Sequence, residues 1–210
     1  MTNPQENVER FEDIIAEYTG AKYAIATDCC TNSIFLTLKY FEAHPDIYGE
    51  KRPIHLPKHT YLSIPQAVQN AGYKKFFTKR EWVGVYQLEP YPLWDSATLF
   101  HKDMYTRSNN GFVCVSFHIK KRIPIGRGGM ILTNDESAAS WLRQARYDGR
   151  KGHMFNDIDD IEVCGYHMYM TPEQAARGIQ LFYGLEENDK PQATWENYPD
   201  VSEYSCFQSI

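Results

Sequence analysis

Residues Val113–Asp135 read VCVSFHIKKRIPIGRGGMILTND, with two apolar segments on either side of a polar, glycine-rich one. The apolar segments are rich in residues that favour β-strands, so we predict a strand, a loop and a second strand. Two adjacent lysines, Lys120 and Lys121, stand in the loop. Lysines are common at the exposed tip of a hairpin, and that explanation is sufficient for this stretch alone. A buried ammonium would instead need a charged partner or a chemical role.

The rest of the chain alternates helical and strand patterns. Apolar residues recur at helical spacing over residues 6–19, and Gly20 is a plausible stop. A cap at Thr171 with Gln174 three residues later predicts the start of a helix that runs to Leu185. Strands are expected at residues 23–27 and 54–57, and further helices at residues 34–43, 63–72 and 135–147. This order predicts an α/β fold with three layers, in which helices flank a mainly parallel sheet.

Composition excludes several classes of protein. A chain of 210 residues with 42% hydrophobic and 14% aromatic residues can bury one sizeable core. The net charge of −5 is spread along the chain without a basic block, so we expect no nucleic-acid partner. No apolar run reaches membrane-spanning length and the start is polar, so we expect a cytoplasmic protein without a membrane partner. Five cysteines without a CxxC pair indicate reduced thiols, with no metal site expected.

Three further segments carry polar groups where expected strands end. DCCTNS, residues 28–33, leads into a helix, and free amides there could bind a phosphate, although capping by Thr31 or Asn32 is the simpler explanation. LWDSA places Asp95 after an apolar run, at the edge where α/β sheets bind ligands, with a helix cap as the alternative. Tyr61 follows another strand, and ordinary packing explains it equally well.

Taken together, these segments supply an anion site, an aromatic side chain, a carboxylate and a lysine. Pyridoxal phosphate needs this set of groups. A lysine reacts with its aldehyde, a carboxylate keeps its ring nitrogen protonated, an aromatic covers the ring and helix amides hold the phosphate. The sequence therefore predicts a pyridoxal 5'-phosphate site.

The sequence resembles the DegT/DnrJ/EryC1/StrS family of sugar aminotransferases, which are fold-type-I pyridoxal phosphate enzymes. Five segments carry the resemblance, in the family's order, and each resembles a family motif. They are FEDIIAEYTGAKYAIATDCCTNSIFLTL, LPKHTYLSIPQAVQNAGY, WDSA, SFHIKKRIPIGRGGMILTND and GYHMYMTPEQAARGIQL. Each match is weak alone, and the shared order is what indicates common descent.

The resemblance implies a role for each matching residue. Lys121 falls on the lysine that forms a Schiff base with the cofactor and moves protons, and Lys120 is the alternative if the register is shifted. Asp95 matches the acid that holds the ring nitrogen, and Tyr61 the stacking aromatic. The other implied cofactor contacts are Cys30, Thr31 and Ser116, which match phosphate anchors, and Thr98 beside the ring. The implied contacts with substrate or a partner subunit are His118, His167 and Tyr169.

The sequence also departs from the family pattern. Thr98 replaces a Gln or His, Arg127 replaces the acid of a Gly-acid-Gly-Gly turn, and His167 and Tyr169 replace an Asn and an Arg. We expect a cofactor-binding large domain at residues 1–185 that is shortened between residues 73 and 95. Residues 186–210 would form a short tail in place of the family's C-terminal small domain.

The resemblance implies a homodimeric enzyme with shared active sites. It would move an amino group from an amino acid, glutamate by analogy, to a keto-sugar nucleotide. A homologue or accessory subunit that binds the cofactor but turns over poorly is the main alternative. Elimination or racemisation on the same cofactor is a third.

Overall fold

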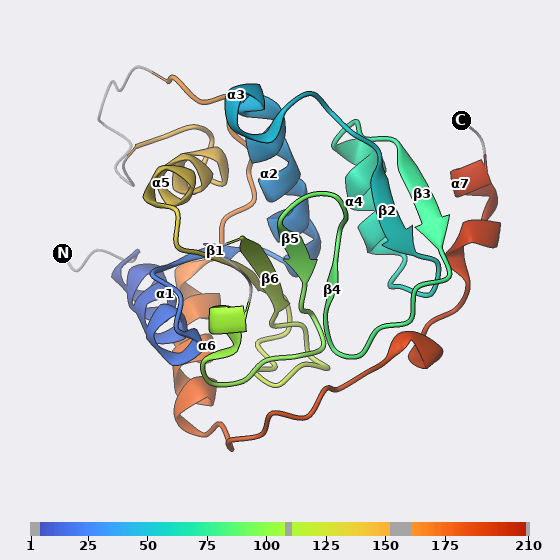
Figure 1. The fold of residues 1–210 in the computed structure, drawn as a ribbon. Helices are drawn as coiled ribbons and strands as arrows, with labels where there is room; N and C mark the ends of the chain where they lie inside the picture. Colours follow the sequence, from blue (N-terminus) through green and yellow to red (C-terminus); the bar gives the residue numbers. More distant parts are fainter. Residues whose placement is uncertain (1–4, 108–110, 152–160, 209–210) are drawn as a thin grey trace.

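Helices cover both faces of a five-stranded sheet, which gives the molecule three layers (Figure 1). This computed structural model describes residues 5–107, 111–151 and 161–208. The strand order is β1-β7-β6-β5-β4. The strands are β1 (Tyr23–Thr27), β4 (Tyr86–Gln87), β5 (Leu93–Asp95), β6 (Phe112–Ser116) and β7 (Gly129–Thr133). Two further strands, β2 (Ile54–Pro57) and β3 (Lys75–Thr78), form a separate parallel pair.

The sheet is mixed, whereas the sequence predicted a mainly parallel one. Strand β5 pairs with β6 in parallel, but the pairs β1–β7, β6–β7 and β4–β5 are antiparallel. Parallel neighbours need a crossover, usually a helix, whereas residues 117–128 between β6 and β7 contain no helix. Strand β7 therefore starts at the edge where β6 ends and returns beside it. The α/β class and the three layers are confirmed.

The predicted helices form close to their expected positions. They are α1 (Glu6–Thr19), α2 (Cys30–Ala43), α4 (Ser63–Asn70), α5 (Glu136–Ala145) and α6 (Pro172–Tyr183). Gly20 ends α1 with a φ of 78°, a conformation that glycine adopts without strain. Helix α6 begins with the predicted capping box of Thr171 and Gln174. Two short helices, α3 (Pro45–Tyr48) and α7 (Ser205–Gln208), were not predicted.

Alternate residues of the strands pack into two separate clusters, one on each face of the sheet. Ile25 and Ile131 belong to a cluster with residues of α2, α4 and α5. Ala24 and Leu132, their neighbours in sequence, belong to a cluster with residues of α1 and α6. This alternation follows from the two-residue period of a strand, and it fixes the helices on either side of the sheet.

A buried ion pair ties the two helical layers to strand β1. Glu12 of α1 accepts the N–H of Ala26 at 2.8 Å and pairs with Arg146, which donates to the carbonyl of Ala26 at 2.6 Å. Glu12 and Arg146 are 2% and 3% exposed, so each charge needs the other. Within the described residues, no helix has the length and apolar character needed to cross a membrane.

The last described residues lie along the molecule. They contain two 3₁₀ turns, η2 (Trp195–Asn197) and η3 (Val201–Glu203), and run from α6 past the sheet to β2 and β3 (Figure 1). Their backbone bonds to loops of the main body, for example from Gln192 N–H to the carbonyl of Thr98 at 2.7 Å. The division into a large domain at 1–185 and a tail at 186–210 remains a prediction.

Candidate active site

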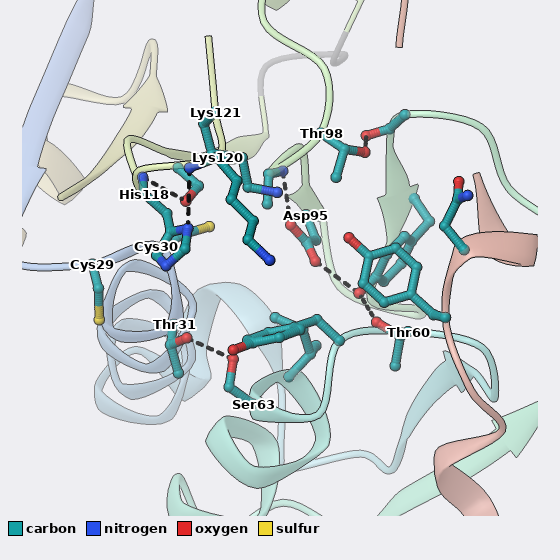
Figure 2. A pocket seen from close by; sticks show the side chains of 18 of the residues that line it. Cys29, Cys30, Thr31, Thr60, Ser63, Asp95, Thr98, His118, Lys120 and Lys121 are labelled. Atoms are coloured by element: carbon teal, nitrogen blue, oxygen red, sulfur yellow. Dashed lines mark hydrogen bonds between the residues drawn. The ribbon is translucent and has the colours of Figure 1, made fainter. Parts of the chain in front are cut away.

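A cavity of about 500 Å³ opens where β5 and β6 end (Figure 2). Its volume lies within the range of ligand sites. The start of α2, the loop after β2, the loop after β5 and the β6–β7 loop all contribute to it. Eight of the predicted site residues line the cavity, and they come from segments far apart in the sequence: Cys30, Thr31, Tyr61, Asp95, Thr98, Ser116, His118 and Lys121.

The first turn of α2 forms one wall. Its N-cap residue is Cys29, in an extended conformation and without a side-chain cap bond, so the expected capping by Thr31 or Asn32 is wrong. Thr31 lies inside the helix and shares a hydrogen bond of 2.7 Å with the hydroxyl of Ser63 (Figure 2). Asn32 instead donates to Asp28 at 2.7 Å. Neither the Thr31 nor the Asn32 side chain caps this helix start, where the helix dipole favours an anion.

A close backbone contact keeps this turn in place. A β-carbon added to Gly129, the first residue of β7, would lie 2.4 Å from both the carbonyl carbon of Cys29 and the nitrogen of Cys30. No side chain fits at that distance. Strand β7 can therefore support the helix start only because residue 129 is glycine.

Asp95 is the last residue of β5, and its side chain is 5% exposed. Its Oδ1 accepts the N–H of Ala97 at 2.9 Å, and its Oδ2 accepts the hydroxyl of Tyr86 at 2.7 Å. The Tyr86 hydroxyl also bonds the Thr60 hydroxyl at 2.5 Å. Burial raises the pKa of Asp95, while the bonds from Tyr86 and Ala97 and the charge of Lys121 lower it. These contacts fix both oxygens of a buried carboxylate that faces the cavity.

Both lysines of the β6–β7 loop line the cavity, but they differ in burial. Lys120 is exposed, whereas Lys121 is partly buried. Burial lowers the pKa of Lys121, the nearby Asp95 and Cys30 raise it, and the charge of Lys120 lowers it again. In Figure 2 the lysines lie between Asp95 on one side and the start of α2 on the other. The explanation as a simple hairpin tip therefore accounts for Lys120 better than for Lys121.

The remaining predicted residues in the cavity have distinct surroundings. Tyr61 is 61% exposed, so packing in the core does not explain it. Thr98 is buried, and its hydroxyl donates to the carbonyl of Gly84 at 2.9 Å. Ser116 ends β6 and accepts the N–H of His118 at 3.3 Å. Their roles toward a cofactor stay predictions.

His167 and Tyr169 are not among the residues that line the cavity. The ring of His167 is 4.8 Å from that of Tyr169, and its Nδ1 is 3.2 Å from Asp148 Oδ2. Tyr169 forms a bridge with Thr27 of β1. Their predicted contact with a partner subunit stays a prediction. Arg127, another departure from the family pattern, lines the cavity and pairs with Asp28 at 2.5 Å.

Several lining residues were missed by the sequence analysis. Tyr86 holds Asp95, yet it lies in a two-residue strand that has no recognisable period. It pairs directly with Asp95 in the β4–β5 ladder, which only the folded sheet reveals. Trp82, Asn197 and Tyr198 also line the cavity, and no local pattern marks them.

The cavity residues fit pyridoxal phosphate. The uncapped start of α2, against which Gly129 leaves no room for a side chain, suits a phosphate. Asp95 is a fixed carboxylate suited to a protonated ring nitrogen, and Lys121 is an amine whose pKa is lowered by burial. Tyr61 supplies an exposed aromatic ring at the same cavity.

Comparison with known proteins identifies relatives of the chain. The sequence model of the DegT/DnrJ/EryC1/StrS aminotransferase family matches residues 1–81 and 104–200. The chain is 23% identical over 231 aligned positions to the spore coat polysaccharide biosynthesis protein SpsC of Bacillus subtilis (strain 168), with 87% of the chain and 58% of SpsC covered. The chain thus spans less than two thirds of this relative.

Two solved structures have a similar fold. The sugar aminotransferase CalS13 from Micromonospora echinospora superposes with a TM-score of 0.65 at 14% identity, covering 84% of this chain and 60% of CalS13. NtdA from Bacillus subtilis, solved with the bound cofactor PMP, gives a TM-score of 0.60 at 19% identity and covers 83% of this chain and 47% of NtdA. The family match covers most of the sequence, and the chain belongs to the DegT/DnrJ/EryC1/StrS aminotransferase family.

Proposed function

We propose that the chain binds pyridoxal 5'-phosphate through Lys121 and moves an amino group from an amino acid, glutamate, to a keto-sugar nucleotide. The observation that carries the proposal is the convergence of Lys121, Asp95 and the uncapped start of α2 on one cavity. Family membership supports the same reaction class.

Each group in the cavity has a task in this proposal. When bound, the cofactor accepts electrons from the carbon that carries the amino group. Asp95 would keep the ring nitrogen of the cofactor protonated. The Tyr86 hydroxyl, itself bonded to Thr60, holds the Asp95 carboxylate in position. The amides at Cys30 and Thr31 would bind the phosphate, and Tyr61 would cover a ring face. The Nζ atom of Lys121 would hold the cofactor and move a proton, which its lowered pKa favours.

A spectroscopic titration tests the cofactor assignment. Wild-type protein with pyridoxal phosphate should develop a near-visible band, Lys121→Ala should abolish it, and the matched variant Lys120→Ala should retain it. Peptide mapping after borohydride treatment should find the label on Lys121. A band that persists in Lys121→Ala, or a label on Lys120, would contradict the assignment.

Adding an amino acid separates transfer from binding alone. Glutamate should abolish the band of the loaded protein and leave the absorbance of the pyridoxamine form. A band that no amino acid changes would favour the second candidate, a cofactor-binding homologue with impaired turnover. The hydroxyl of Thr98 is a reason to consider it, since that hydroxyl bonds Gly84 instead of pointing free into the cavity.

We also propose a homodimer with shared sites. Two exposed apolar side chains, Val83 and Ile119, belong to the loops around the cavity and would be covered by a second subunit. Light scattering of the purified protein tests this, and a monomer at micromolar concentration would contradict it.

A further inference from the structure

Residues 191–201, here called the strap, run along the rim of the cavity. Four backbone hydrogen bonds hold the strap to loops of the main body: Gln192 N–H to the Thr98 carbonyl at 2.7 Å, Gly84 N–H to the Ala193 carbonyl at 3.0 Å, Trp195 N–H to the Trp82 carbonyl at 3.0 Å and Val201 N–H to the Lys58 carbonyl at 2.9 Å. Bonds of this kind at both ends and in the middle make the strap a part of the wall.

Side chains anchor the strap as well. Asp200 pairs with Lys58 at 2.5 Å, and neighbouring Val201 is fully buried. The ring of Tyr198 is 5.5 Å from the ring of Trp82, and the backbone carbonyl of Tyr198 is 2.9 Å from Nδ1 of His59. The aromatic pair holds Tyr198 over the cavity.

Two strap residues with polar side chains line the cavity. Asn197 and Tyr198 both line it, together with the aromatic rings of Tyr61 and Trp82. The Oδ1 atom of Asn197 accepts the N–H of Thr194 at 2.8 Å, which orients the amide. Within the described part of the chain, no acceptor bonds its Nδ2 group, so this group can donate to a ligand.

The hydroxyl of Tyr198 is also a donor. Burial raises the pKa of Tyr198, and the negative charge of Asp95 and the neighbouring Tyr61 raise it further, so the hydroxyl keeps its proton at neutral pH. The strap side of the cavity thus combines apolar ring faces with two hydrogen-bond donors. A flat molecule with apolar faces and oxygen acceptors at its edge suits such a surface.

We propose that Asn197 and Tyr198 of the strap determine specificity by binding the sugar ring of the substrate, donating to its keto or hydroxyl oxygens while the ring of Trp82 packs on its face. This inference rests on the proposed aminotransferase function, because that function defines the substrate as a keto sugar. It assigns the start of α2, Asp95 and Lys121 to the cofactor and the strap to the sugar.

Equilibrium binding to the cofactor-loaded protein tests the assignment. The probes are GDP-, UDP-, dTDP- and CMP-linked 4-keto-hexoses, titrated by tryptophan fluorescence, with the cofactor affinity measured separately by absorbance. For the tightest probe, Tyr198→Phe should raise Kd about 3- to 10-fold, since it removes one hydrogen bond. Asn197→Ala should have a similar effect, and Tyr198→Ala a larger one. Tyr183→Phe, an exposed tyrosine outside the cavity, is the matched control and should leave Kd unchanged.

Hydrogen exchange gives a second readout. The strap amides of Trp195 and Val201 should exchange more slowly when the tightest probe is bound. Unchanged Kd in the three strap variants, with a wild-type protein that binds a probe, overturns the strap assignment alone. Absence of a cofactor band, or a wild-type protein that binds none of the probes, overturns the proposed function and the strap assignment with it, so the two failures are distinguishable.

Discussion

The cavity has two walls that are built differently. The sheet-edge wall consists of Cys30, Thr31, Asp95, Ser116 and Lys121, which stand at the ends of regular elements or in the loop between two strands. The strap wall consists of Asn197 and Tyr198, which stand in or next to a short 3₁₀ turn. Ladder hydrogen bonds and a buried core fix the first wall, whereas individual bonds to loops fix the second.

This difference indicates which wall of the cavity can change its side chains without loss of stability. A wall held by a sheet resists displacement because moving one residue disturbs a whole ladder. A strap held by separate contacts can exchange side chains without disturbing the sheet. We therefore expect changes in the sheet-edge wall to alter stability and cofactor binding, and changes in the strap to alter little beyond ligand affinity.

The largest expected effect comes from Gly129, where the sheet-edge wall tolerates no added atom. Gly129→Ala should lower the free energy of unfolding by about 3 kcal/mol, because its β-carbon would collide with the backbone of Cys29 and Cys30. Urea denaturation measures the loss. Gly184→Ala is the control, since its β-carbon meets only the Leu181 carbonyl at 3.7 Å, and it should change stability by less than about 0.5 kcal/mol. A stable Gly129→Ala protein would show that the wall is more adaptable than inferred.

Tyr86→Phe tests the support of Asp95 and should have the next largest effect. The change removes the donor to Asp95 Oδ2 and should cost about 2 kcal/mol of stability, because the buried carboxylate loses one bond. It should also weaken pyridoxal phosphate binding. Tyr91→Phe is a matched control, since that buried hydroxyl accepts the N–H of Arg52 outside the cavity. Equal cofactor affinity in both variants would show that Tyr86 does not support cofactor binding.

The electrostatic coupling between Lys121 and Asp95 predicts a smaller, pH-dependent effect. Only the neutral amine reacts with acetic anhydride, and burial lowers the pKa of Lys121. Because the charge of Asp95 raises that pKa, Asp95→Asn should lower it further and move the labelling curve of Lys121 to lower pH. Trace acetylation followed by peptide mass spectrometry measures the curve. Asp103→Asn is the control and should not move it, and a shift to higher pH in Asp95→Asn would contradict the coupling.

The smallest effect is expected at the anchor of the strap wall. Bonds from Lys58 and Ser202 lower the pKa of Asp200 to about 2, against an ordinary value of 3.8. The ionised carboxylate therefore contributes stability above about pH 4 that is lost as the pH falls toward 2. Pepsin cleavage within the strap should accelerate over this window in the wild-type protein. Asp200→Asn, compared with the wild-type protein at each pH, should already be cleaved faster at about pH 4 and should lack this added acceleration. Identical cleavage profiles of the two proteins would show that the ion pair does not stabilise the strap.

Local patterns predicted a large part of the fold. The helix at residues 6–19, the strand at residues 23–27 and the capping box at Thr171 form as expected, because each depends on contacts within a few residues. The strand order β1-β7-β6-β5-β4 was not predictable, since local patterns do not state which strands lie side by side. The cap of α2 was also misjudged, because Thr31 finds a partner in Ser63, which lies 32 residues away.

Some residues of the candidate site could be predicted from local motifs, and others could not. Lys121, Asp95, Tyr61 and Thr31 could be proposed from ordered motifs, and they do line one cavity. Tyr86 could not be proposed, because its contact with Asp95 needs two strands to pair in one register. His167 and Tyr169 match a family segment, yet they are not among the residues that line the cavity.

The sequence by itself determined the family and the order of helices and strands, and it supplied the candidate lysine and carboxylate, because these depend on residue type and on spacing along the chain. Only the tertiary structure decided which of the two lysines is sheltered, which side chain holds Asp95 and that the strap lies on the cavity rim. Those features arise from contacts between residues tens of positions apart, and the free energy of such contacts is set by burial and register in the folded chain.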